Sequence, residues 1–164
     1  MKAELAKSRG MLCFSKDWHN PVQWSHYADS HRGICLGFEV PNPNLVQVSY
    51  TRKRLVAEVE KFEKLDEATM LRFLTTKYSH WKYENEWRCF LRLEQRDADS
   101  SFYFAKFSEQ LRLVQVIVGA RSSITRRTLL ESLGEIAPDV AISKARLAFR
   151  SFRVVRQRNE RLWS

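Results

Sequence analysis

The chain has 164 residues, of which 44% are hydrophobic and 12% aromatic, with few glycines and prolines. A chain of this length buries roughly two-thirds of the surface of its unfolded form, and the composition excludes a disordered or fibrous protein. Residues 111–120 form the longest apolar run, far short of the ~20 residues of a membrane helix, so no membrane association is expected. We predict a single domain over residues 1–164, with a flexible lead at 1–10 and a tail at 159–164.

The N-terminal segment and the cysteines indicate a cytoplasmic protein. Residues 1–10 contain charges but no apolar stretch, so no secretory signal is expected. Cys13, Cys35 and Cys89 lie far apart in strand-like sequence and have no paired spacing. We therefore expect reduced, buried thiols rather than a disulfide framework or a zinc site.

Positive charge is concentrated in the C-terminal third. The net charge is +9, and from Arg121 onward ten basic side chains stand against four acidic ones, which accounts for six of these nine charges. Such a surplus attracts phosphate-rich partners, so we expect a nucleotide, a nucleic acid or an acidic protein. Arg153, Arg156 and Arg158 are the candidate nucleic-acid-binding residues, and scattered arginines that only solubilise the surface are the alternative.

Short runs of apolar and β-branched residues alternate with turn residues in the first third of the chain. Residues 11–15 are predicted to form a strand. A cap at Asn20, a proline after it and a stop at Gly33 predict a helix of about three turns. Residues 34–40 and 45–51 are predicted strands, and the PNPN turn between them indicates a hairpin.

The middle of the chain changes from helical to strand periodicity. Residues 52–80 predict two helices, or one helix broken near Leu65 and Asp66. Asp66 is expected to cap the second part, with Glu67 in its first turn. From about Asn85 to residue 93, apolar and charged residues alternate, which favours a strand.

The last third predicts strands around one helix. Residues 101–107 and 111–120 are predicted strands, and residues 140–149 and 151–158 are predicted to close the fold as a strand pair. Between them, Leu129, Leu130 and Leu133 are predicted to face inward from a capped helix. With about six to eight strands and three or four helices, the predicted class is α+β with a mixed, largely antiparallel sheet.

An aromatic and polar block around the first helix is one candidate site. At helical spacing, Trp24, Tyr27 and His31 share a face, whereas His26 lies on another. One interpretation is core packing, with His31 bonded to a backbone carbonyl near the helix end. The other is a pocket in which aromatic walls hold a planar ligand and His31 donates a hydrogen bond or transfers a proton.

A second candidate site lies on the predicted strand after Asn85. On one strand face, Glu84 and Glu86 would have Cα atoms about 6.5 to 7 Å apart, with Arg88 beyond them. One carboxylate can then orient a substrate while the other stabilises positive charge or acts as a base. The alternative is a solvated face on which Arg88 pairs with Glu86 and contributes little to stability.

Other common catalytic motifs are absent from the sequence. The histidines show no metal-ligand spacing and there is no CxxC pair, so no metal is expected. Neither a GxSxG turn nor a glycine-rich phosphate loop occurs.

Several blocks of the sequence follow one another in an order typical of a bacterial family. The blocks are CFS (13–15), WSHYADSHRGICLGFEV (24–40), KYSHWKYENEWR (77–88) and VIVGARSS (116–123). Together they resemble the family of domain of unknown function 2971 over residues 11–155. That family has no settled activity, and its members usually begin with a further segment. The resemblance leaves open whether this chain is incomplete, completes its site with a partner chain, or has lost activity.

A more distant resemblance is to ADP-ribosyltransferases, and it implies NAD as the substrate. The shared layout is a strand ending in Ser, an aromatic and polar helix and a late strand with Glu-x-Glu. In that chemistry a carboxylate stabilises the oxocarbenium character that develops as nicotinamide departs. The resemblance implies that Glu86 is this catalytic group and that Glu84 orients the acceptor. It implies an NAD-binding set of Ser15, Trp24, Tyr27, His31 and Arg88.

Two functional hypotheses follow from these patterns. The first is an NAD-dependent ADP-ribosyltransferase-like enzyme or NAD hydrolase, as in a toxin or a phage-defence system. The second is a non-catalytic module that uses the basic C-terminal third to bind nucleic acid, or that assembles with a partner protein or a second copy of itself.

Overall fold

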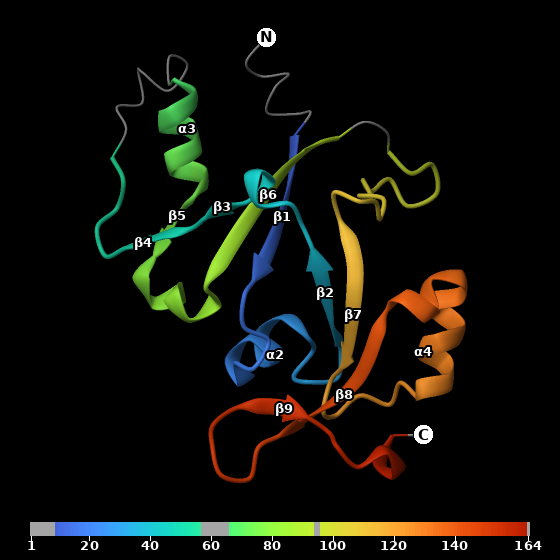
Figure 1. Ribbon diagram of the computed structural model, residues 1–164. Helices are drawn as coiled ribbons and strands as arrows, with labels where there is room; N and C mark the ends of the chain where they lie inside the picture. Colours follow the sequence, from blue (N-terminus) through green and yellow to red (C-terminus); the bar gives the residue numbers. More distant parts are fainter. Residues whose placement is uncertain (1–8, 57–65, 94–95, 164) are drawn as a thin grey trace. The chain divides into compact units, whose positions relative to one another are not determined.

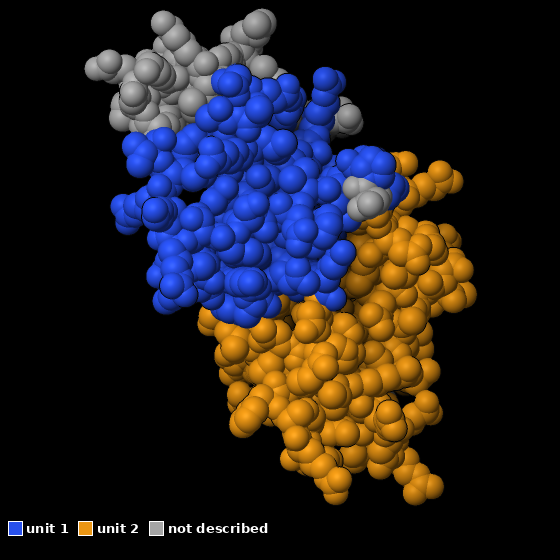
Figure 2. All heavy atoms as spheres, turned by 60° about the vertical axis from the view of Figure 1, so that its left-hand side comes forward, with its two compact units in different colours: residues 1–16, 41–106 blue, residues 17–40, 107–164 orange. Residues whose placement is uncertain are grey.

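The computed structural model describes residues 9–56, 66–93 and 96–163 (Figure 1). The chain divides into two compact units, each built from two stretches of sequence (Figure 2). Unit 1 contains residues 1–16 and 41–106, and unit 2 contains residues 17–40 and 107–164. The single domain expected from the sequence stays a prediction. Within the described ranges, no helix is long and apolar enough to cross a bilayer.

Unit 1 has a three-stranded antiparallel sheet and a two-stranded parallel one. Its elements are β1 (Arg9–Ser15), η1 (Asn42–Asn44), β3 (Val46–Gln47), β4 (Ser49–Thr51), α3 (Glu67–Leu74), β5 (Thr76–Tyr78), η3 (Ser79–Glu84) and β6 (Glu86–Arg92). The strand β6 lies between β1 and β3, and β4 pairs with β5. As predicted, Asp66 caps α3 by accepting a hydrogen bond from the Thr69 amide at 2.6 Å.

Unit 2 is built around a four-stranded mixed sheet in the order β2, β7, β8, β9. Its elements are α2 (Pro21–Tyr27), β2 (Ile34–Glu39), β7 (Arg112–Val118), α4 (Arg126–Leu133), η4 (Gly134–Asp139), β8 (Ala141–Leu147), β9 (Val154–Arg156) and η5 (Glu160–Leu162). The parallel strands β7 and β8 are joined through α4, as a parallel pair requires a crossover. The pairs β2–β7 and β8–β9 are antiparallel.

The strand β7 supplies both hydrophobic cores of unit 2. Val116 and Val118 pack with Leu129 of α4 and with Trp163. Ile117, which points the other way, packs in the cluster of Trp24 from α2. Because successive side chains of a strand alternate between its faces, β7 is covered on both sides and its last three residues are at most 1% exposed.

The α+β class with mixed, largely antiparallel sheets is confirmed. Among the described strands four pairings are antiparallel and two are parallel. The predicted strands at 11–15, 34–40, 86–93 and 111–120 and the closing pair are observed as β1, β2, β6, β7 and β8 with β9.

The predicted three-turn helix before Gly33 is wrong in length. The helix α2 ends at Tyr27, after which Asp29, Ser30 and His31 adopt left-handed backbone angles with φ of 43°, 52° and 70°. Left-handed residues other than glycine are uncommon and end a right-handed helix. The Gly33 amide then donates to the Ala28 carbonyl at 2.8 Å and closes the turn.

The predicted hairpin of residues 34–40 and 45–51 is also wrong. Instead, β2 pairs with β7 in unit 2, while β3 pairs with β6 in unit 1. Residues 45–51 are divided between two short strands, β3 and β4, in different sheets. The local turn signal is overridden because a long apolar strand such as β7 offers β2 a fully covered partner.

Three smaller predictions need correction. Residues 101–107 contain no strand, only the bridge of Arg96 with Tyr103. Leu130 is 39% exposed, whereas Leu129 is buried and Leu133 packs against the core. Residues 52–56 are not helical, and the remainder of the first helix predicted after residue 52, at 57–65, lies outside the described residues.

At both ends of the chain, described residues of the predicted lead and tail are structured. Arg9 already belongs to β1, and residues 1–8 of the predicted lead lie outside the described residues. In the predicted tail, Trp163 is 9% exposed, and its indole N–H donates to the Ile124 carbonyl at 3.0 Å. The C-terminal segment is therefore part of the core of unit 2.

Replacing Trp163 should destabilise unit 2. We expect Trp163→Ala to lower the free energy of unfolding by about 3 kcal/mol, because it empties a packed site and leaves the Ile124 carbonyl without its donor. Its neighbour Leu162, which is 63% exposed, is the matched control, and Leu162→Ala should change stability by less than about 0.5 kcal/mol. Urea denaturation of the three proteins measures both effects, and equal stabilities would show that the C-terminus is a loose tail.

Candidate functional site

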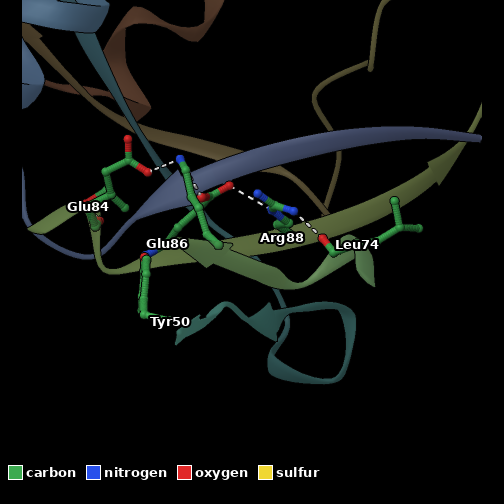
Figure 3. Close-up of polar contacts among 7 residues, drawn as sticks. Tyr50, Leu74, Glu84, Glu86 and Arg88 are labelled. Atoms are coloured by element: carbon green, nitrogen blue, oxygen red, sulfur yellow. Dashed lines mark hydrogen bonds and ion pairs between the residues drawn. The ribbon is translucent and has the colours of Figure 1, made fainter. Parts of the chain in front are cut away.

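The two predicted catalytic carboxylates, Glu84 and Glu86, both accept hydrogen bonds from one lysine in unit 1 (Figure 3). Glu84 and Glu86 are each 5% exposed. The Lys77 ammonium donates to Glu84 and, at 3.2 Å, to Oε2 of Glu86. The two glutamates do not share a strand face as predicted, because Glu84 lies in η3, the next residue Asn85 is left-handed with φ of 46°, and the strand begins at Glu86. Of the alternative, the pairing of Arg88 with Glu86 is observed, but the solvated face is wrong because both carboxylates are buried.

Neighbouring groups occupy the remaining polar atoms around Glu86. The Arg88 Nε donates to Glu86 Oε1 at 2.8 Å, and its Nη1 donates to the Leu74 carbonyl (Figure 3). The Glu86 backbone amide donates to the Tyr50 hydroxyl at 2.8 Å. Both carboxylate oxygens of Glu86 are thus held by cations.

The first strand adds two side chains to this charged cluster. The Ser15 hydroxyl donates to the Glu84 backbone carbonyl at 2.6 Å, and the register of β1 with β6 places Ser15 opposite Glu86 and Cys13 opposite Arg88. Cys13 is exposed, contrary to the prediction of buried thiols, whereas Cys89 is buried.

Electrostatics keep Glu86 ionised. Burial raises the pKa of Glu86, but hydrogen bonds from Arg88, Cys13 and Lys77 outweigh it and lower the pKa to about 2. Although Cys13 as a residue is exposed, partial burial of its thiol and the neighbouring Glu86 carboxylate raise its pKa to about 11. At neutral pH, Glu86 is therefore a permanent anion and a poor general base, and Cys13 is a protonated, weakly nucleophilic thiol.

The aromatic block of unit 2 is divided between the core and the surface. Trp24 is 3% exposed and its indole N–H donates to the Trp18 carbonyl at 2.6 Å, whereas Tyr27 is 66% exposed. The two residues therefore do not share a face as predicted. The left-handed turn returns His31 onto Trp24, with the rings parallel within 7° and their centroids 6.3 Å apart.

The surroundings of His31 favour the neutral form of its imidazole. Burial and then the Arg121 guanidinium lower its pKa below the ordinary value. Its Nδ1 is buried and has no hydrogen-bond partner among the described residues. Of the predicted NAD-binding set, Ser15 and Arg88 belong to unit 1, and Trp24, Tyr27 and His31 belong to unit 2.

A basic hollow of about 610 Å³ lies in unit 2. We call it the arginine groove, and its lining residues come from the segment before α2 and from β8, β9 and their connection. They are Trp18, His19, Arg146, Ala148, Phe149, Arg150, Ser151, Val155, Arg156 and Arg158. Two of the three predicted nucleic-acid-binding residues, Arg156 and Arg158, are among them.

Backbone pairing holds the two walls of the arginine groove together. The Val154 amide donates to the His19 carbonyl at 2.8 Å, and His19 Nδ1 donates back to the Val154 carbonyl at 2.7 Å. Val154 is fully buried, so this join is protected from water. The Trp18 and His19 rings lie against each other with centroids 3.9 Å apart.

The third predicted arginine points elsewhere. Arg153 lies 3.8 Å from the Asp17 carboxylate, and both side chains are about half exposed. Sequence reasoning did not single out Trp18, His19, Arg146, Phe149 or Arg150. The signal for them was the repeated pairing of arginine with phenylalanine in RLAFRSFR (146–153), which the charge count alone did not separate from the other arginines.

The sequence and the structure match no protein-family model, no curated protein and no solved structure. The resemblances to the family of domain of unknown function 2971 and to ADP-ribosyltransferases stay predictions, as do the cytoplasmic location and a partner protein. No three metal-ligating side chains gather in residues 9–56, 66–93 and 96–163.

Replacing Lys77 should destabilise the protein, because two buried carboxylates then lose the cation that they share. We expect Lys77→Met to destabilise the protein by about 3 kcal/mol or more, because a buried charge without its counterion is strongly unfavourable. The exposed Lys82 is the matched control, and Lys82→Met should have an effect below about 0.5 kcal/mol. Chemical denaturation at neutral pH measures the difference, and similar effects of the two substitutions would contradict a buried ion cluster.

The lowered pKa of Glu86 predicts acid sensitivity. A carboxyl with a folded pKa of about 2 and an ordinary value of 4.5 contributes stability that is complete above pH 4.5 and is lost as the pH falls toward 2. Glu86→Gln should be less stable at neutral pH and should lose less stability over this interval than the unsubstituted protein. Denaturation curves at stepped pH and constant ionic strength test this, and parallel pH profiles would rule out the assigned role of Glu86.

Proposed function

We propose that this protein binds nucleic acid through the arginine groove of unit 2. The observation that supports this most directly is the meeting of four arginines with two aromatic side chains around one hollow. The arginines are Arg146, Arg150, Arg156 and Arg158, and the aromatic residues are Trp18 and Phe149.

The chemistry of these side chains suits a phosphate backbone. A guanidinium is always charged and presents a planar fork of donors that matches phosphate oxygens. Arg150, Arg156 and Arg158 are exposed, so binding a phosphate requires no opening of the core. The net positive charge of the C-terminal third adds long-range attraction and releases counterions on binding.

Specific contacts in unit 1 make the carboxylates a weaker candidate site than the arginine groove. The cations of Lys77 and Arg88 already occupy both oxygens of Glu86, which is the arrangement of a structural ion cluster. The buried, ionised state of Glu86 is the observation that favours the transferase hypothesis, because a carboxylate of this kind can stabilise an oxocarbenium ion.

The transferase hypothesis has a direct test. Purified protein is incubated with labelled NAD, alone and with cell extract, and released nicotinamide and labelled product are measured. Turnover that Glu86→Gln abolishes would support an NAD-dependent enzyme. Absence of turnover, or full activity in Glu86→Gln, would rule out the transferase hypothesis.

Two groove arginines should control affinity for nucleic acid and its salt dependence. We expect Arg156→Ala with Arg158→Ala to weaken binding of a fluorescent oligonucleotide and to make the plot of log affinity against log salt shallower by about 1.4, for two lost phosphate contacts on a single strand. Fluorescence anisotropy between about 50 and 200 mM salt measures both quantities.

The control removes the same charge from elsewhere in unit 2. Arg126→Ala with Arg127→Ala, at the start of α4, has the same net charge as the groove variant. Equal losses in the two double variants would reduce the effect to net charge and contradict a groove-specific site. Undetectable or salt-independent binding by the unsubstituted protein would overturn the proposed function itself.

A further inference from the structure

The loop between β8 and β9 exposes two phenylalanines, of which Phe149 lines the arginine groove and Phe152 lies three residues further along the same loop. The loop is the red turn at the lower edge of Figure 1, and it spans residues 148–153. Phe149 is 92% exposed and Phe152 is 98% exposed. Among the described residues these are the two most exposed large aromatic side chains. The next is Phe104, which is 68% exposed.

The loop is held in place at its base. The Ala148 amide donates to the Arg153 carbonyl at 2.9 Å, which continues the ladder of β8 and β9 by one rung. Below this rung Val154 is anchored to His19 through the backbone contacts described above. The two rings are therefore displayed on a closed hairpin, so a ligand orders little backbone when it binds.

Arginines flank the exposed rings. The Arg146 guanidinium lies over the Phe149 ring, 4.7 Å from its centroid, and Phe149 and Arg150 both line the groove. The high exposure of Phe149 leaves most of its ring surface accessible although Arg146 covers part of it. Phosphate-binding cations and open aromatic faces thus occur within a few residues of each other.

This combination selects one kind of ligand. In a duplex the base faces are stacked on one another, so an exposed ring finds no free base face, and only phosphates and base edges are accessible. In a single strand the bases are free, and stacking on aromatic side chains beside a basic groove is the usual mode of binding. Phenylalanine and arginine side chains can also bind a lipid surface. Such a surface is flat, however, whereas these arginines line a hollow, which fits a strand better than a membrane.

We infer that Phe149 and Phe152 stack the bases of a single-stranded nucleic acid whose phosphates lie in the arginine groove. The inference rests on the proposed function and narrows its ligand from nucleic acid in general to single strands. Binding should show little sequence preference, because every base has a flat face.

The test separates stacking from phosphate contact. The probes are a fluorescein-labelled oligothymidylate of roughly 12 nucleotides, an abasic strand of the same length and a duplex of the same length. The abasic strand retains the phosphates and lacks the bases. Affinities are measured by anisotropy at one salt concentration for the full chain and for Phe149→Leu with Phe152→Leu, which keeps apolar side chains and removes the rings.

Two further double variants serve as controls. Phe149→Trp with Phe152→Trp retains aromatic faces and should retain binding. Phe102→Leu with Phe104→Leu makes the same change at phenylalanines of unit 1 that are 67% and 68% exposed, and it should leave binding unchanged. Circular dichroism confirms that each variant is folded.

We expect oligothymidylate to bind more tightly than the abasic strand and the duplex. Phe149→Leu with Phe152→Leu should weaken oligothymidylate binding at least about fivefold and leave abasic binding unchanged. Equal affinities for oligothymidylate and the abasic strand, or equal losses on both, would overturn the inference and leave the proposed function intact.

Two other outcomes would also overturn it. If no strand and no duplex binds, the proposed function fails and the inference fails with it. If the phenylalanine variant loses binding to vesicles of anionic phospholipid while its oligonucleotide affinity is unchanged, the loop contacts a membrane surface instead.

Discussion

Burial of β7 on both faces is the constraint on which unit 2 depends. Val116 and Val118 reach one core and Ile117 reaches the other, so helices must cover the sheet on both sides. The crossover through α4 then places β8 beside β7, and β9 extends the sheet by pairing with β8. The arginine groove forms at this last pair, where Val154 joins β9 to His19. Its geometry therefore follows from packing that is far from the groove in sequence.

The charged cluster of unit 1 shows how residue types that suggest catalysis can serve stability. Two carboxylates two residues apart are typical of acid–base sites. Here Lys77 pairs with both of them and Arg88 pairs with one, so two cations balance two anions. The Lys77 ammonium also lies 4.7 Å from the centroid of the Trp81 ring. Such a network is costly to assemble and more costly to break, because each buried charge depends on its partner.

In the proposed binding mode, the arginines and the phenylalanines of the β8–β9 region would contribute two physically different interactions. Guanidinium groups attract and position phosphates without regard to sequence, and their contribution weakens with salt. Open aromatic faces contribute by dispersion and stacking, which salt screens little, and they distinguish unpaired bases from paired ones. Phe149 and Phe152 are too exposed to contribute to the core, and Phe149 lines the same hollow as the four arginines.

The sequence by itself determined the elements whose signals are local. Periodicity located β6 and β7, the Asp66 cap located the start of α3, and alternation located β8 and β9. The surplus of arginine in the last third predicts a partner rich in phosphate, and of the three arginines proposed for it, Arg156 and Arg158 line the groove whereas Arg153 does not. Only the tertiary structure decided that β2 leaves its neighbour in sequence for β7, that Lys77 lies between Glu84 and Glu86, and that Trp18 faces the same groove as Arg158. These contacts join residues distant in sequence, and their energies come from burial and charge pairing that no local pattern contains.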